Sequence, residues 1–389
     1  GAGNYVGVGG NVKQSELIKT ANVRELQEET GLIAIEDNLV LAGKINFLFP
    51  AKPDWNRIVY IYTLQKWQGE AQESEEISPA WFEINKIPYD KMWADSQHWL
   101  PKILAGEKIN AQFTYSDDNE TLTDFSIENM RNYLWLHLQT LPYFRSLLRA
   151  VEAHYYQDLP LAEPIYDLGC GDGHFASLTF DHKIDIGLDP WEDQIREAPR
   201  YGAYKSLVVA DGGQTPFPSN HFASGLSNSV LEHVQEIDQV LLETARILQP
   251  GALFLFCVPN PDYYTALAVP SVLKKLGLTS LAKNYINWFA RISRVFHANP
   301  PEEWQTRLAS AGLELVKWWN YFPPASLRVL EWGHYFGLPS FLLQKLLGRS
   351  ILAPYRWNLG LTARLIRPYV DVQPTDNGTF TFYVARKLK

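Results

Sequence analysis

The sequence contains few cysteines and no long apolar run, and each shortage excludes a class of protein. Cys170 and Cys257 are the only two cysteines among 389 residues, so the disulfide framework of a small secreted domain is excluded. No uncharged apolar stretch reaches the ~18 residues that a membrane-spanning helix needs. The first residues show neither the basic segment nor the apolar core of a signal peptide. We therefore expect a cytoplasmic protein.

Positive charge is scarce in the first third of the chain. Residues 1–129 contain 11 Lys and Arg against 20 Asp and Glu, whereas residues 130–389 contain 24 against 23. An acidic region repels polyanions unless metal ions intervene. The nearly neutral remainder lacks the broad basic face of a nucleic-acid-binding domain. We therefore expect no nucleic-acid partner.

The pattern of residues changes near Met130, and the chain has about twice the length of a typical domain. Before Met130, one helix is expected over residues 15–30, where Ser15 can cap its start and Gly31 can end it. The remaining apolar runs of this part predict strands at 38–47, 57–67, 80–84, 109–115 and 121–127. These elements predict an α+β domain over residues 1–129.

Beyond Met130, helical stretches alternate with short apolar runs. The runs lie at 163–169, 184–189, 206–211, 222–227 and 252–259. Buried parallel strands have this composition. The pattern predicts an α/β domain with a doubly wound sheet over residues 130–389, so the chain as a whole is expected to be α/β.

A helix rich in glutamate follows a glycine pair in the first part. Glu25, Glu28 and Glu29 are spaced so that a helix places their carboxylates on one face. Like charges at this spacing repel, but a divalent cation such as Mg²⁺ reverses the effect and binds hard oxygen ligands. Gly9 and Gly10 allow close approach of the backbone to a metal or phosphate. The alternative is a solvated acidic face, which the fixed spacing of the whole segment disfavours.

The segment from Gly10 to Leu32 resembles the complete signature of the Nudix hydrolases, and residues 1–129 are similar to the 8-oxo-dGTP diphosphatases. The resemblance implies cleavage of a nucleoside triphosphate to the monophosphate and pyrophosphate, with Mg²⁺ or Mn²⁺. Family members carry a first strand before the segment that opens this chain, so we expect an incomplete Nudix fold. The implied metal ligands are Glu25, Glu28, Glu29 and Glu76. The implied catalytic residues are Glu28 or Glu29 for the attacking water, and Arg24 to orient the glutamates.

Two departures from the family concern the base of the nucleotide. The family reads an oxidised purine with an Asn before the glycines and with two consecutive Asp residues. This chain has Val6 at the first place and Asp95-Ser96 at the second. Trp93 and Asp95 remain as the expected substrate-binding residues, and losing a hydrogen bond costs about 1–3 kcal/mol of discrimination. The resemblance therefore supports the diphosphatase chemistry more than specificity for 8-oxo-guanine.

A glycine loop with acidic residues carries the chemistry of the second part. The loop follows an apolar strand, and three glycines permit a tight turn against which a ligand can lie. Asp189 ends the next strand, where a carboxylate can accept both hydroxyls of a ribose. Asp211 ends the third strand, where an acid can accept a hydrogen bond from an adenine amine. Asn228 closes the fourth.

Residues 143–389 resemble the class I S-adenosylmethionine-dependent methyltransferases, which have a Rossmann-like fold. The alternative is an NAD-binding domain, but its glycine motif has two residues, not one, between the second and third glycines, which here are Gly171 and Gly173. His233 is a candidate base facing the methyl acceptor, and its alternative is a structural histidine. The implied residues for S-adenosylmethionine are Asp167, Gly169, Gly171, Gly173, Asp189, Asp211 and Asn228.

Residues 324–369 are too long for a simple connection between strands. They contain six Lys and Arg against Glu331 alone. An apolar helical stripe is expected from Leu338, Phe341, Leu342 and Leu346. We interpret this insertion as a lid over the acceptor, with contact to a membrane surface or an anionic lipid as the alternative. The expected acceptor is a small or lipid-linked molecule.

Two functional hypotheses remain at this point. In the first, a nucleoside triphosphate diphosphatase is joined to a methyltransferase and both are active. In the second, only the methyltransferase is active, and residues 1–129 are a nucleotide-binding or accidentally fused remnant.

Overall fold

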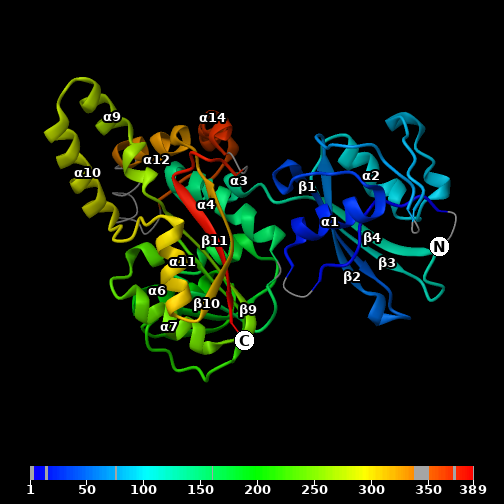
Figure 1. The fold of residues 1–389 in the computed structure, drawn as a ribbon, viewed down its shortest axis with the longest axis horizontal. Coiled ribbons are helices and arrows are strands. Elements are labelled where there is room, and N and C mark those ends of the chain that lie inside the picture. The colour runs from blue at the N-terminus through cyan, green and yellow to red at the C-terminus, as the bar shows by residue number, and fades with distance from the viewer. Residues whose placement is uncertain are drawn as a thin grey trace. The chain divides into compact units, whose positions relative to one another are not determined.

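The computed structural model describes residues 4–13, 16–74, 77–159, 161–336, 350–370 and 374–388. The chain divides into two compact units. The first unit comprises Gly1–Arg131 and Asp158–Pro160, and the second comprises Asn132–Gln157 and Leu161–Lys389. Figure 1 shows both units, each with its own sheet.

The first unit is built on a four-stranded mixed sheet with the order β2-β1-β3-β4. β1 pairs antiparallel with β2 and parallel with β3, and β3 pairs antiparallel with β4. Ile45, Ile109 and Phe113 are fully buried in its core, which Ile103 of α2 helps to cover. The elements are α1 (Ile18–Thr30), β1 (Leu39–Leu48), β2 (Arg57–Leu64), α2 (Ser96–Leu104), β3 (Ile109–Tyr115) and β4 (Leu122–Asn129).

The expected elements of this unit form with one exception. α1 ends as predicted, because Gly31 adopts a left-handed φ of 71° and donates its N–H to the Gln27 carbonyl. α1 begins at Ile18, later than the expected start at residue 15, and Leu17 precedes its first turn without a side-chain cap; the expected cap, Ser15, itself lies outside the described residues. The strand predicted at 80–84 is wrong: this segment is irregular, and Ile84–Lys86 forms a short 3₁₀ turn. Trp81 is exposed and stacks on Trp67 instead of entering a sheet.

The second unit contains a seven-stranded sheet with the order β10-β11-β9-β8-β5-β6-β7. The strands from β5 to β9 are parallel, as the apolar runs predict, whereas β11 is antiparallel to both neighbours. The strands are β5 (Ile165–Leu168), β6 (Ile184–Asp189), β7 (Tyr204–Val209), β8 (Phe222–Asn228), β9 (Leu248–Pro259), β10 (Leu313–Tyr321) and β11 (Phe380–Lys387). This is the Rossmann-like arrangement expected of the second unit.

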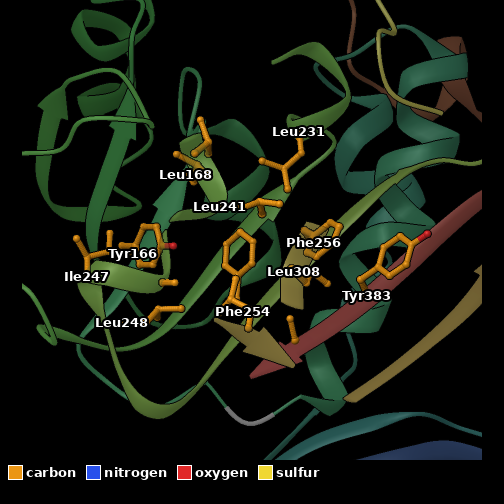
Figure 2. Packing of buried hydrophobic residues seen from close by; sticks show 14 of the residues in the cluster. Tyr166, Leu168, Leu231, Leu241, Ile247, Leu248, Phe254, Phe256, Leu308 and Tyr383 are labelled. Carbon is orange, nitrogen blue, oxygen red and sulfur yellow. The ribbon is translucent and has the colours of Figure 1, made fainter. Parts of the chain in front are cut away.

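A large aromatic and aliphatic cluster fills one side of this sheet. Figure 2 shows Phe254 and Phe256 of β9 beside Tyr166 and Tyr383 from β5 and β11. α7 (Ile237–Ile247) and α11 (Pro301–Ser310) supply further buried side chains to this cluster. Leu168, the last residue of β5, belongs to this cluster, so the packing holds the strand end from which the glycine loop starts.

The insertion between β10 and β11 packs on two helices that precede the sheet. α12 (Pro324–Phe336) and α14 (Arg356–Ile366) lie against α3 (Tyr133–Leu138) and α4 (Tyr143–Tyr155). Leu359 and Ile366 of α14 are buried in this contact. The predicted stripe of Leu338, Phe341, Leu342 and Leu346 lies outside the described residues. Among the helices that are described, none is both long enough and apolar enough to cross a membrane.

Candidate functional sites

One arginine organises the acidic face of α1. The Arg24 guanidinium donates to Glu16 at 2.8 Å, to Glu25 at 2.7 Å and to Glu28 at 2.9 Å. It also donates to the Asn11 carbonyl at 3.1 Å, which ties the segment after the glycines to the helix. Because Arg24 donates a hydrogen bond to Glu16, the pKa of Glu16 is lowered to about 2. The structure therefore brings Arg24 and two of the three predicted helical ligands into one cluster.

The glycine segment lies directly against the carboxylates. The Gly9 N–H donates to Glu29 Oε2 at 3.0 Å. A Cβ placed on Gly10 would lie 2.3 Å from the Glu25 carboxyl carbon, so a side chain at position 10 would displace this carboxylate. Glu28 is exposed, whereas Glu25 and Glu29 are mostly covered. Glu28 is thus the carboxylate most open to a substrate or water.

The kind of donor in this cluster suits a hard divalent cation. Three carboxylates share one helix face, and the missing side chain of Gly10 leaves backbone next to them. In the described ranges, however, no three Asp, Glu, His or Cys side chains are gathered closely enough to hold a metal ion. Arg24 occupies the space between the carboxylates. The fourth predicted ligand, Glu76, lies outside the described residues.

The two residues predicted to bind the base lie near each other in the first unit. Trp93 is partly exposed, and its ring contacts the edge of Tyr115 with 6.5 Å between ring centroids. Asp95 is buried and accepts hydrogen bonds from Tyr115 and, at 2.7 Å, from Trp99 Nε1. Burial and this bond raise the pKa of the Tyr115 hydroxyl, which stays a donor. The Asp95 carboxylate is therefore held rigidly beside Trp93.

The glycine loop of the second unit needs left-handed backbone conformations. Gly169, Gly171 and Gly173 have φ values of 76°, 54° and 79°. A Cβ on Gly169 would lie 2.4 Å from Val230 Cγ1, so the loop also packs too closely for a side chain there. The Gly171 N–H donates to Asp189 Oδ2 at 3.0 Å. The loop and the acid after β6 therefore form one structural group.

The predicted acids of the second unit differ in their environments. Asp189 is buried, accepts a second hydrogen bond from the Trp191 N–H at 2.9 Å, and has a pKa raised by burial. Asp167 accepts from the Tyr204 hydroxyl at 2.6 Å, and burial raises its pKa to about 7. Asp211 is exposed beyond β7 and accepts from the Gly213 N–H at 2.7 Å. Only Asp211 presents its carboxylate openly to solvent.

His233 ends a 3₁₀ turn after β8 and sits beside a buried acid. Its Nδ1 lies 2.8 Å from the Arg294 carbonyl, which can only accept, so Nδ1 carries the proton. Burial lowers the pKa of the ring, which leaves Nε2 as a free acceptor 3.8 Å from Glu232. Glu232 Oε2 has no hydrogen-bond partner in the described structure, and burial raises the pKa of Glu232 to about 8.

Sequence reasoning missed a buried carboxylate next to Asn228. Glu152 of α4 is fully buried and accepts from Asn228 Nδ2 and Ser229 Oγ at 2.7 Å each. Arg149 donates to it at 2.5 Å and Tyr321 at 3.2 Å. These partners lie far from Glu152 in the sequence except for Arg149, one turn earlier. Only this i, i+3 pair could have drawn attention to it.

Comparisons with known proteins support the two parts separately. A family model for the NUDIX domain matches residues 1–103, and a model for a methyltransferase domain matches residues 166–256. The oxidized purine nucleoside triphosphate hydrolase of Mus musculus is 34% identical over 133 residues, which are 34% of this chain and 83% of that protein.

Two methyltransferases match the second unit over shorter spans. A tRNA (carboxymethyluridine(34)-5-O)-methyltransferase of Schizosaccharomyces pombe is 30% identical over 107 residues, which are 27% of this chain and 45% of that protein. A fatty-acid O-methyltransferase of Mycolicibacterium smegmatis is 33% identical over 104 residues, 25% of this chain and 38% of that protein. The chain thus spans less than half the length of either protein.

The glycine-backed glutamate helix and the mouse relative agree on the first unit, and the glycine loop with Asp189 and the methyltransferase model agree on the second. The chain belongs to the Nudix family through a domain like that of the oxidized purine nucleoside triphosphate hydrolases, and this domain is fused to a class I S-adenosylmethionine-dependent methyltransferase domain.

Proposed function

We propose that the first unit hydrolyses a purine nucleoside triphosphate to the monophosphate and pyrophosphate. The observation that carries this proposal is the cluster of Arg24 with Glu16, Glu25 and Glu28 beside the Gly9–Gly10 backbone. A module that only binds a partner has no need of three carboxylates crowded on one helix face. A divalent cation held by Glu25, Glu28 and Glu29 would neutralise phosphate charge and activate water.

The residues of the chain have distinct tasks in this proposal. Glu28, the exposed carboxylate, accepts the proton of the attacking water. Arg24 fixes the rotamers of Glu25 and Glu28 through its two Nη1 hydrogen bonds. The Gly9 N–H holds Glu29 in the same way. Catalysis here depends on position, because each hydrogen bond restricts a side chain that would otherwise move freely.

Trp93 and Asp95 support a substrate class, as does the activity of the similar mouse protein, an oxidized purine nucleoside triphosphate hydrolase. A planar purine can stack on the exposed part of Trp93, and the rigid Asp95 can accept from an amine or imide N–H. Val6 is exposed and offers no hydrogen bond in the segment before the glycines. We therefore propose an oxidised purine nucleoside triphosphate as substrate, with weaker discrimination between bases than an Asn at this place would give.

Pyrophosphate release by the full chain tests the proposal. Activity is expected only with Mg²⁺ or Mn²⁺, and Glu28→Gln should lower turnover by about 100-fold or more, since the charge at the metal site is lost. Glu107→Gln, an exposed glutamate paired with Lys102, is the matched control and should leave turnover unchanged. Activity in excess chelator, or full activity of Glu28→Gln, would contradict the assignment. Absence of any nucleotide hydrolysis would favour the hypothesis that only the methyltransferase is active.

We propose further that the second unit methylates a small or lipid-linked acceptor and not a nucleic acid. Its residues 130–389 are almost neutral, so they lack the charge that supplies affinity for a phosphate backbone. S-adenosylmethionine, when bound, supplies an electrophilic methyl group. Gly169, Gly171 and Gly173 provide the turn against which it lies, and Asp189 and Asp211 would accept hydrogen bonds from its ribose and adenine.

His233 is the proposed base for a hydroxyl acceptor. Its Nε2 is unprotonated because Nδ1–H is held by the Arg294 carbonyl. The remaining contribution of the unit is proximity, since methyl transfer needs donor and acceptor in line. In His233→Gln the side-chain amide can still donate a hydrogen bond to the Arg294 carbonyl, but the unprotonated ring nitrogen that would act as the base is lost.

Transfer of a labelled methyl group separates the acceptor classes. The full chain is incubated with labelled S-adenosylmethionine and, in parallel, with fatty acids, long-chain alcohols or tRNA. We expect label in the lipid-like acceptors only. Asp189→Ala should weaken cofactor binding by about 10- to 100-fold, the scale of lost hydrogen bonds to a charged group. Robust labelling of tRNA, the substrate named for the Schizosaccharomyces pombe relative, would overturn the acceptor class.

A further inference from the structure

Two helices that follow β9 expose apolar side chains to solvent. α9 (Ala268–Lys275) and α10 (Thr279–Ser293) form a hairpin after the loop at Asn260. Val272, Leu276 and Leu278 are exposed around its turn. A helix pair on a protein surface normally turns polar residues outward. The outer end of this hairpin departs from that pattern because it exposes apolar residues.

The exposed residues of α10 form a stripe rather than isolated positions. Leu281, Trp288 and Ile292 are spaced by seven and four residues and therefore lie on one face of the helix. Ala282 and Phe289, each one residue further along, are fully buried. The apolar arc of α10 thus continues from the protein interior onto the surface. Trp288 also stacks on Tyr335 of α12, with 6.3 Å between ring centroids.

α14 exposes large apolar side chains to an even greater extent. Trp357, Leu361 and Leu365 repeat every four residues and are 79%, 69% and 63% exposed. Leu359 and Ile366 on the opposite side are buried against α3 and α4. Three large apolar side chains therefore face outward from α14, accompanied by the exposed Arg356 and Arg364.

The segments that carry both exposed apolar surfaces are also rich in Lys and Arg. Residues 263–301 contain five Lys and Arg and no Asp or Glu, and residues 350–370 contain three Arg and no acid. The cations are Lys274, Lys275, Lys283, Arg291, Arg294, Arg356, Arg364 and Arg367. Since residues 130–389 balance 24 basic against 23 acidic residues, the rest of this unit is acidic by comparison. Figure 1 shows α9, α10, α12 and α14 toward the upper end of the second unit, and α6 (Glu192–Glu197) and α7 toward its lower end.

We propose that α9, α10 and α14 form a lipid-docking face that seats the second unit on an anionic membrane surface. Exposed Trp, Leu and Ile side chains insert among the headgroups, and the flanking Lys and Arg pair with anionic lipid phosphates. A protein partner without an excess of acidic residues would leave the eight Lys and Arg residues without counter-charges. An anionic bilayer offers both an apolar interior for the exposed side chains and negative headgroups for these cations. The proposal is independent of the Nudix chemistry, and it goes beyond the proposed acceptor because docking does not require the acceptor to be a lipid.

Flotation of the full chain with vesicles tests this face. Vesicles of phosphatidylcholine with phosphatidylglycerol should bind the protein, and vesicles of phosphatidylcholine alone should bind it much more weakly. Raising the salt concentration should reduce binding, because the attraction between exposed charges is screened. Equal binding to both vesicle types, or no binding to the anionic ones, would overturn the proposal.

Substitutions distinguish vesicle binding through this face from nonspecific binding by the rest of the surface. Trp357→Ser with Leu361→Ser should reduce partitioning roughly 100-fold, and Leu281→Ser about tenfold, since exposed apolar area is removed. Arg364→Glu should reduce it about 30-fold, as an attraction becomes a repulsion. Leu242→Ser on α7 and Arg200→Glu are matched exposed controls and should have no effect.

Two further readouts keep the result interpretable. Binding of S-adenosylmethionine should survive in every variant, which shows that the second unit is folded. The molar mass of the free protein in solution should not change with the Trp357→Ser and Leu361→Ser substitutions. Vesicle binding that is insensitive to all substitutions would overturn the proposal, and so would a dimer that these substitutions dissociate, because the face would then belong to a second copy of the chain.

Discussion

Two arginine–glutamate clusters, one in each unit, use the same chemical groups under opposite conditions. Arg24 joins Glu16, Glu25 and Glu28 on the surface of α1, where the Glu28 side chain is 56% exposed. Arg149 joins Glu152 inside the second unit, where the Glu152 side chain is fully buried. The first cluster has an excess of negative charge, whereas neutral donors surround the second.

The burial of the carboxylates decides which of the two clusters can rearrange. The Arg24 cluster is open to water at its Glu28 end, and exposed ion pairs contribute little to folding, so its Arg24–Glu28 pair can rearrange around a cation or a substrate at small cost. A buried carboxylate must keep its partners, because removing one leaves an uncompensated charge in a poorly polarisable interior. In the proposed function the first cluster carries the chemistry, whereas the second holds the end of β8 in place.

The largest expected effect comes from breaking the buried cluster. Arg149→Ala leaves Glu152 without its cation and should lower the free energy of unfolding of the second unit by about 3–5 kcal/mol. Denaturant unfolding measures this, and the transition of the second unit is the one that S-adenosylmethionine shifts. The double variant Arg149→Met with Glu152→Gln should recover part of the loss. A loss below about 1 kcal/mol for Arg149→Ala would show that this buried pair behaves like an exposed one.

A smaller effect is expected from the titration of Asp167. Burial raises its pKa to about 7, so between about pH 4 and pH 7 the folded state holds a proton that the unfolded state has lost. Stability of the second unit therefore falls as the pH rises through this window and levels off above it. Asp167→Asn removes this dependence and keeps an acceptor for the Tyr204 hydroxyl.

The measurement is the difference in unfolding free energy between Asp167→Asn and the unchanged protein at several pH values. The difference should grow from pH 4 to pH 7 in favour of the variant. Glu232, whose pKa is raised to about 8, contributes the same trend to both proteins and cancels. Parallel pH profiles would show that Asp167 is ionised throughout.

The smallest expected effect on stability comes from Arg24. Arg24→Ala breaks one pair with the exposed Glu28 and two with the partly covered Glu16 and Glu25, all beside solvent, and should lower the unfolding free energy of the first unit by about 1–2 kcal/mol, less than Arg149→Ala does. Added salt should shrink this loss further. Nucleotide hydrolysis should fall far more than stability does, because Glu25 and Glu28 lose the group that positions them. A stability loss as large as that of Arg149→Ala would remove the contrast between the two clusters.

Much of the fold follows from local signals. The apolar runs of the second unit all become strands, because a parallel sheet covered on both faces demands short continuous apolar segments. The orientation of β11 does not follow from its composition, since its residues are as apolar as those of a parallel strand. The segment at 80–84 fails as a strand because Trp81 finds a stacking partner in Trp67 rather than a neighbouring strand.

The site residues divide in the same way. Gly169, Gly171, Gly173 and Asp189 are visible in the sequence because a short loop and the strand after it bring them together. Glu152 is invisible, since Asn228 and Tyr321 approach it from distant parts of the chain. Spacing reveals groups that local geometry assembles, and only tertiary packing reveals the others.

The position of β11 has a consequence for how the protein is made. β11 is the last of the seven strands to be synthesised, yet it pairs with β9 on one edge and β10 on the other. Until it emerges from the ribosome, β10 has no strand to join and β9 exposes an unpaired edge. The first unit, whose sheet has β4 as its last strand in the chain, is synthesised long before that moment. Nascent second units therefore depend longest on protection from aggregation.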